Sequence, residues 1–477
     1  MPALATRRPR AARLPVRPVL IGGGVVGLEL VVALGITDPR FFRLLLLLLA
    51  GVALTLVFCF PFAAACGLLV LTASINLPEV AFGVGPIDVR PYELLLGALL
   101  LVALVRPARA SWGGWAGGAL AAFLAVLGLS TVLAVSEGAV TITGTVTWVR
   151  PFFLYAFFFV VVRLFADPES LRKLLAFAAG LAAISGVVAA LIALSGGIGG
   201  VLDFGEGYST QTSLDAARRV RVPGVALAYA LFWLVVVRVV RTRGRDRLLW
   251  SLALAGMALN IVVSQNRNMW IGLVVGCLLM LTFGGPQLRH RVVLGAAVLA
   301  AGLVVMLTFG FRIDEDSRFA PILARGTTLF DPAAVGQESS LTHRAEENQL
   351  AWDVVRENPV FGIGAGTNFG QTFGEARPDG TTRRTNQNFL HNQYLYLLMI
   401  GGVPLLVTFM TYLGAVLAPF ARRQEPALIP YAVGLVMIMV SAVVMLSFTS
   451  VEIVSAIGLL TGAIWAWTRS GEAAALA

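Results

Sequence analysis

The chain has 477 residues, of which 58% are hydrophobic and 13% charged, and its formal net charge is +10. Soluble domains are usually about 45–50% apolar and about 25% charged, so this composition excludes a soluble globular enzyme, a disordered protein and a nucleic-acid-binding protein. Because a membrane-spanning helix needs about 20 apolar residues, the composition predicts an all-α polytopic membrane protein with about 12–14 transmembrane helices.

Apolar segments that approach the length of a membrane span recur along the whole chain. They cover residues 18–36, 43–58, 60–77, 91–106, 114–135, 149–165, 172–195, 224–240, 248–265, 269–284, 292–310, 391–418, 427–447 and 450–468. The pair on either side of Phe60-Pro61 reads either as two spans or as one kinked or re-entrant element. The pattern predicts a basic cytosolic tail (1–17), about eleven transmembrane helices (18–310), a large extracytoplasmic loop (311–390) and C-terminal transmembrane helices (391–477).

Arginine clusters orient these spans. With the N-terminus in the cytosol, nearly every dense cluster falls on the cytosolic side, as the positive-inside rule requires. These cytosolic segments lie at 7–17, 106–109, 163–173, 241–247, 286–291, 422–423 and in the tail after Arg469. Among the other arginines, several lie on the outer side, against this bias, and need a separate reason: Arg150, Arg218, Arg219, Arg221, Arg267, Arg344, Arg383 and Arg384.

The loop at 311–390 is the one sizeable polar block of the sequence. Residues 341–358 read as a helix with Ala345, Trp352 and Val355 on its apolar face, and Pro359 ends it. A Gly-rich turn at 361–366 follows; its glycine spacing does not fit a dinucleotide-binding fingerprint. We expect the acidic side chains of the loop to be solvated, with metal binding left open: Asp314, Glu315, Asp316, Glu346 and Glu347.

A tight hairpin between two spans carries the first candidate site, Ser264-Gln265-Asn266-Arg267-Asn268-Met269-Trp270. Arg267 there either reaches lipid headgroups as an interfacial anchor or binds a ligand. Four neutral polar neighbours are more than an anchor needs, which favours a ligand.

A second candidate site lies at 218–224, where an outer loop enters a span with Arg218, Arg219 and Arg221. Guanidinium groups match the geometry of phosphate oxygens, so the cluster suits an anionic ligand, although anchoring to anionic lipid is the alternative. Arg150, before Pro151, reads first as an interface anchor and second as a further anion contact.

His391 lies where the large loop re-enters the membrane, next to Asn392 and after a run of Asn and Gln. An imidazole can accept a proton at neutral pH, so His391 is either a structural interface residue or a general base in a wet cavity. Glu452, near the outer start of the last span, is expected to pair with an arginine or to have a functional role.

Three segments together resemble bacterial O-antigen ligases and the related O-antigen and exopolysaccharide polymerases. Residues 264–270 resemble the family's Ser-x-Ser-Arg-Gly-x-Trp hairpin, 357–366 its Asn-Pro-Leu-Phe-Gly-x-Gly stretch, and 391–404 its His-Asn-x-x-Leu signature with a Gly-rich continuation. The resemblance covers about residues 219–418. Asn266 and Asn268 depart from the hairpin pattern, and Asn tolerates the left-handed conformation that a Gly there would adopt.

The resemblance implies a GT-C-type membrane glycosyltransferase that uses no metal and no cofactor. It would take a glycan from undecaprenyl diphosphate at the outer leaflet of the bacterial cytoplasmic membrane. Arg267 and Arg221, with Arg219 as the alternative to Arg221, would bind the diphosphate, and His391 would deprotonate the acceptor hydroxyl. Arg150 would add a diphosphate contact, and Asn392, Ser264 and Arg344 would support the site.

The implied partners are the lipid-linked glycan, a glycan, lipid or protein acceptor, and membrane lipids, with no nucleic acid. A polymerase that joins lipid-linked repeat units shares this donor and differs only in its acceptor. A transporter or flippase of lipid-linked saccharides is the alternative from another class. It would need polar groups along a path to both faces, whereas those of this sequence gather on the outer side.

Overall fold

The computed structural model describes residues 51–73, 82–84, 87–106, 111–195, 224–264, 266–293, 339–376, 382–423, 427–445 and 447–470. The chain divides into two units, Met1–Phe60 and Pro61–Ala477. The described part of the first unit is helical over Gly51–Cys59. The predicted tail at 1–17 and the arginines at 218, 219 and 221 lie outside the described residues.

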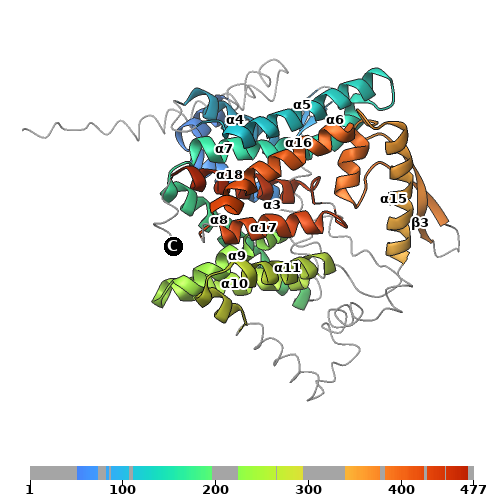
Figure 1. Cartoon of the computed structure of the whole chain (residues 1–477). Coiled ribbons are helices and arrows are strands. Elements are labelled where there is room, and N and C mark those ends of the chain that lie inside the picture. The colour runs from blue at the N-terminus through green and yellow to red at the C-terminus, as the bar shows by residue number, and fades with distance from the viewer. Residues whose placement is uncertain are drawn as a thin grey trace, which may run out of the picture. The chain divides into compact units, whose positions relative to one another are not determined.

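Helices dominate the described part of the second unit (Figure 1). The elements are α3 (Pro61–Ala73), β1 (Phe82–Val84), β2 (Ile87–Val89), α4 (Pro91–Val105), α5 (Gly114–Ser136), α6 (Ile142–Phe153), η2 (Leu154–Ala156), α7 (Phe157–Leu164), α8 (Pro168–Ser195), α9 (Val225–Arg241), α10 (Gly244–Val263), α11 (Arg267–Phe283), α15 (Ser339–Glu357), β3 (Gly370–Ala376), β4 (Thr382–Gln387), α16 (Gln393–Arg423), α17 (Ile429–Ser441) and α18 (Val451–Ser470).

Among the described residues, six helices are long and apolar enough to cross a membrane, or seven if the bent pair Gly51–Cys59 and Pro61–Ala73 forms one span. Three shorter apolar helices, α4, α11 and α17, accompany them. These helices confirm an all-α polytopic membrane protein. The count of 12–14 spans and the domain boundaries stay predictions, because the first expected span (18–36) and most of the eleventh (292–310) lie outside the described residues.

Small residues set the closest helix contacts. A Cβ atom added to Gly186 of α8 would overlap the carbonyl oxygen of Gly256 in α10, so these two helices touch through their backbones. On α11, added Cβ atoms at Gly272 and Gly276 would overlap Tyr229 and Trp233 of α9. Close packing through small residues is the usual way that membrane helices associate, because lipid supplies no hydrophobic drive between them.

Two antiparallel hairpins are the main difference from the helical expectation. β1 pairs with β2, and β3 pairs with β4 with an irregularity between Phe373 and Ala376. β1 and β2 have only three residues each, and β4 reads Thr-Arg-Arg-Thr-Asn-Gln, with no apolar alternation. Neither hairpin therefore carries the period-two signal by which a strand is recognised.

The α15 helix marks one end of the second unit, which we call the α15 end. Figure 1 shows α15 and β3 beside the start of α16, with α15 running across the direction of the neighbouring long helices. At the opposite end, Arg163 Nε donates to the carbonyl oxygen of Ala103 at 3.2 Å, and its guanidinium lies 4.5 Å from the ring centre of Trp112. Arg469 Nη1 lies 3.3 Å from Ser111 Oγ at that same end. These two arginines, which the sequence assigns to the cytosolic side, therefore lie away from α15; which side of the membrane each end faces stays a prediction.

Candidate active site

His391 and Glu347 form a close pair at the α15 end. The Nδ1 atom of His391 lies 2.8 Å from Oε2 of Glu347. The Glu347 side chain is 1% exposed, whereas that of His391 is 28% exposed. Beside an ionised Glu347 carboxylate, which only accepts hydrogen bonds, Nδ1 would carry the proton and Nε2 would be the free basic nitrogen. The expectation that Glu347 is solvated is therefore wrong.

The helical spacing of α15 explains the burial of Glu347. Glu347, Ala351 and Val355 follow one another at intervals of four residues and are all buried, with Ala351 0% and Val355 7% exposed. Residues four apart share one helix face, and this face packs on α16. Of the predicted apolar stripe only Val355 is buried; Ala345 and Trp352 are exposed. The sequence does contain a signal for this burial: Glu347 lies four residues before Ala351 and eight before Val355, on the same helix face.

Asn392 holds the start of α16 rather than lying free in a cavity. Its Oδ1 accepts from the backbone N–H of Leu395 at 3.2 Å, and its carbonyl oxygen accepts from Tyr396 N–H at 2.9 Å. Asn is one of the preferred residues at this position, because its short side chain satisfies a helix N–H that has no other partner. The cap fixes the direction in which the chain leaves His391.

The Gly-rich turn that follows α15 docks on a break in α16. The N–H groups of Ile363 and Gly364 donate to the carbonyl oxygens of Met399 and Ile400 at 2.9 and 3.0 Å. In return, Val403 N–H donates to the Pro359 carbonyl oxygen at 2.9 Å. The two motifs that are distant in sequence, 357–366 and 391–404, therefore form one hydrogen-bonded junction.

Gly402 makes this junction possible, and its replacement is a test. It has φ 67° inside α16, and an added Cβ would overlap the Val360 carbonyl oxygen and lie 2.7 Å from that of Pro359. We expect Gly402→Ala to destabilise the protein by at least about 1–2 kcal/mol, the cost of a left-handed L-residue. Thermal unfolding in detergent measures the effect. Gly414→Ala on the same helix is the control, because nothing lies within 4 Å of its added Cβ. Equal melting temperatures for the two variants would contradict the junction.

Aromatic rings connect α6 to the histidine. Trp148 stacks on Phe389 with ring centres 6.1 Å apart and an interplanar angle of 16°. Phe389 in turn makes an edge contact with the His391 ring at 5.7 Å. Gly366 of the Gly-rich turn packs on the same tryptophan, since its added Cβ would lie 2.7 Å from Trp148 Cδ1. The imidazole therefore lies between a carboxylate and an aromatic wall.

The α10–α11 hairpin is held by its own polar residues. Ser264 Oγ donates to the Ile261 carbonyl oxygen at 2.7 Å, and Asn266 Oδ1 accepts from Asn268 N–H at 3.2 Å as the cap of α11. Asn266 has an extended backbone and Asn268 lies in the first helical turn, so neither needs the left-handed conformation expected for this turn. Arg267 is the first residue of α11; its side chain lies outside the described set.

The connection between α17 and α18, residues 442–450, joins this hairpin to the start of α16. Asn268 Nδ2 donates to the carbonyl oxygen of Val444 at 3.4 Å. Gln393, two residues after His391, donates its N–H to Ala442 at 2.8 Å and accepts from Thr449 Oγ1 at 3.1 Å. The backbone segments that carry Arg267 and His391 thus share one support at the α15 end.

Glu452 caps a helix in the described structure. Its Oε1 accepts from the Ala226 N–H at 2.8 Å, in the first turn of α9. A carboxylate is favoured at this end of a helix, where N–H groups and the helix dipole are positive. Arg221 comes three residues before Gly224, the residue that precedes α9. Arg218, Arg219 and Arg221 themselves lie outside the described residues. The α9 start is thus joined to the start of α18, just after the 442–450 connection.

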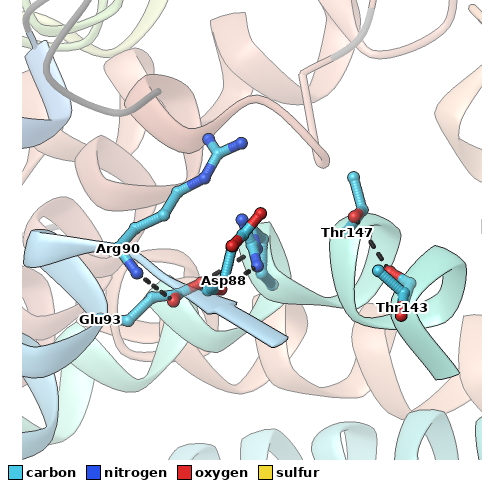
Figure 2. Close-up of polar contacts among 6 residues, drawn as sticks. Asp88, Arg90, Glu93, Thr143 and Thr147 are labelled. Carbon is cyan, nitrogen blue, oxygen red and sulfur yellow. Dashed lines mark hydrogen bonds and ion pairs between the residues drawn. The ribbon is translucent and has the colours of Figure 1, made fainter. Parts of the chain in front are cut away.

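Arg150 is a buried brace between α6 and the β2–α4 segment. Its Nε lies 3.1 Å from Glu93 Oε1, and its Nη2 donates to the Asp88 carbonyl oxygen at 2.7 Å. Figure 2 shows Glu93 also accepting from the Arg90 backbone, at 2.8 Å. Removing one partner from a buried ion pair is strongly destabilising. A diphosphate contact by Arg150 stays untested, as does a supporting role for Arg344, which lies partly buried on α15 one turn before Glu347.

A match to a known protein family includes much of this site. A protein-family model described as O-antigen ligase matches residues 252–410. No curated protein matches the chain. The matched segment includes the α10–α11 hairpin, Glu347, the Gly-rich turn and His391, and it lies within residues 219–418, over which the three motifs resemble the same family.

Proposed function

We propose that this chain, with its O-antigen ligase family domain at residues 252–410, transfers a glycan from undecaprenyl diphosphate to an acceptor hydroxyl. The reaction takes place at the outer leaflet of the bacterial cytoplasmic membrane. The observation that carries the proposal is the pair of buried Glu347 and partly exposed His391, 2.8 Å apart, at the end of the bundle where the Arg267 turn is also supported.

The α15 end faces the periplasm in this proposal. Its support is the gathering of Arg163 and Arg469 at the opposite end, since basic residues are retained on the cytosolic side. Undecaprenyl-linked saccharides of the outer leaflet would then reach the site laterally from the membrane.

In the reaction, the acceptor oxygen attacks the anomeric carbon of the donor glycan. The bond from that carbon to the diphosphate oxygen breaks, and undecaprenyl diphosphate leaves with the electron pair. The acceptor proton passes to Nε2 of His391. Arg267 and Arg221, from the family resemblance, bind the diphosphate and stabilise the charge that it gains, because fixed guanidinium groups need no reorganisation as the bond breaks.

The direct test uses purified protein in nanodiscs with an undecaprenyl-diphosphate-linked saccharide and candidate acceptors. Release of undecaprenyl diphosphate that depends on a lipid or protein acceptor identifies a ligase. Release with donor alone, accompanied by longer lipid-linked chains, identifies a polymerase. Movement of the donor across a vesicle bilayer without any release would overturn the proposal in favour of a transporter.

Transfer is expected to persist in a chelator. Guanidinium groups can stabilise the leaving diphosphate without a divalent cation. The measurement is the transfer rate in excess EDTA compared with the rate after Mg²⁺ or Mn²⁺ is restored. A loss that either metal reverses would contradict the metal-independent mechanism.

A further inference from the structure

The Glu347 carboxylate lies in an environment that a negative charge tolerates only with a partner. Its side chain is 1% exposed, and His391 Nδ1 lies 2.8 Å from its Oε2. Moving a carboxylate out of water is costly unless hydrogen bonds and an opposite charge compensate. A proton added to the imidazole supplies that opposite charge. The geometry thus places a carboxylate oxygen 2.8 Å from the imidazole nitrogen that faces away from Nε2.

Separate elements hold the two partners. Glu347 comes from the buried face of α15 with Ala351 and Val355, whereas His391 precedes α16, whose first turn is capped by Asn392. The turn after α15 is tied to α16 by the hydrogen bonds of Ile363. Because neither side chain depends on the other for its backbone position, the carboxylate meets the imidazole in a fixed orientation.

We propose that Glu347 is a positioning residue for the transfer reaction: it accepts the Nδ1 proton of His391, directs the basic Nε2 toward the acceptor hydroxyl, and stabilises the imidazolium that forms. This inference rests on the proposed function. In the step concerned, the acceptor O–H bond breaks and its proton joins Nε2, while the Nδ1 proton stays between His391 and Glu347. The acceptor oxygen forms the new glycosidic bond, and the diphosphate leaves with the electron pair of the old one. The imidazolium later returns its extra proton to solvent.

The consequence is that α15 belongs to the catalytic unit. It is part of a loop that could otherwise serve only to bind glycan. The carboxylate would orient the imidazole through the ring nitrogen opposite the basic one. The third residue of a hydrolytic triad orients its histidine base in the same way.

Glu347→Gln tests the proposal, with Glu346→Gln as the matched control on the next residue of the same helix. Gln keeps the size and a hydrogen-bond acceptor for Nδ1 but removes the charge. We expect Glu347→Gln to lower kcat by about 10- to 100-fold, part of the range that general-base catalysis contributes. The donor KM should be unchanged, because the diphosphate contacts are intact. Glu346→Gln should leave kcat within about two-fold of wild type, because Glu346 is only partly buried and lies outside the helix face that carries Glu347, Ala351 and Val355.

A second measurement separates positioning from a merely structural role. The acceptor used by the wild type is compared with an analogue that carries fluorine beside the reactive hydroxyl, which makes that hydroxyl more acidic. A weakened base should be partly rescued by the acidic acceptor, so the deficit of Glu347→Gln should shrink. Glu347→Asp keeps the charge and should have intermediate activity. Donor binding by each variant checks that the variants fold.

The outcomes separate this inference from the function on which it rests. Wild-type protein that transfers glycan while Glu347→Gln behaves like Glu346→Gln would overturn the positioning role alone. The same would follow if Glu347→Gln were equally impaired with both acceptors, since that pattern indicates a structural defect. Wild-type protein that transfers no lipid-linked saccharide would overturn the proposed function and this inference together.

Discussion

Replacing His391 with Ala is expected to lower glycan transfer by about 10²- to 10⁴-fold, the range that a general base contributes. The variant loses the nitrogen to which the proposed function assigns the acceptor proton, and it leaves buried Glu347 without its imidazole partner. The measurement is the release of undecaprenyl diphosphate by purified protein. Donor binding should be retained, because the proposed function assigns it to the guanidinium groups of Arg267 and Arg221.

Two further variants make this result interpretable. His391→Gln keeps a hydrogen-bonding side chain beside Glu347. It therefore shows whether the loss of transfer in His391→Ala comes from the missing base or only from misfolding. His290→Ala is the matched control, since His290 is exposed beyond the opposite end of α11. Normal transfer by a folded His391→Gln variant would remove His391 as the base.

Arg267→Lys is expected to be nearly as damaging as Arg267→Ala, with transfer reduced by about 10²- to 10³-fold, comparable to losing one preorganised donor to a developing negative charge. Lysine keeps the positive charge but presents a point charge in place of the rigid two-pronged donor that matches phosphate oxygens. The readouts are kcat and the affinity for the lipid-linked donor.

The control for this substitution is Arg245→Lys. Arg245 is exposed in the first turn of α10, at the far end of that helix from the hairpin. Its replacement should leave transfer unchanged. An Arg267→Lys variant with full activity would show that charge alone suffices and would exclude two-point binding of the diphosphate by this residue.

Local patterns were enough for several features of this protein. Composition predicts a polytopic helical membrane protein, because a span needs a long run of apolar residues that any window of sequence can reveal. The α10–α11 hairpin follows from two apolar runs separated by a few polar residues. Pro359 predicts that the helix ends at residue 358, and α15 ends at Glu357, one residue earlier. The order of the three motifs also predicts the family that matches residues 252–410.

Contacts between distant residues could be decided only by the tertiary structure. Glu347 and His391 are 44 positions apart, and no local period indicates that they meet. The same holds for the ion pair between Arg150 and Glu93 and for the hydrogen bond from the Ala226 N–H at the start of α9 to the Glu452 carboxylate. In the sequence, Gly401-Gly402 is only part of the Gly-rich continuation of the histidine motif, and its role as the break on which the Gly-rich turn docks appears only in the structure. The sequence alone determines which segments are helices and which side chains can donate, accept or carry charge, because these depend on neighbours along the chain. Only the packing of those helices decides which charges are buried together, because that depends on where remote segments meet.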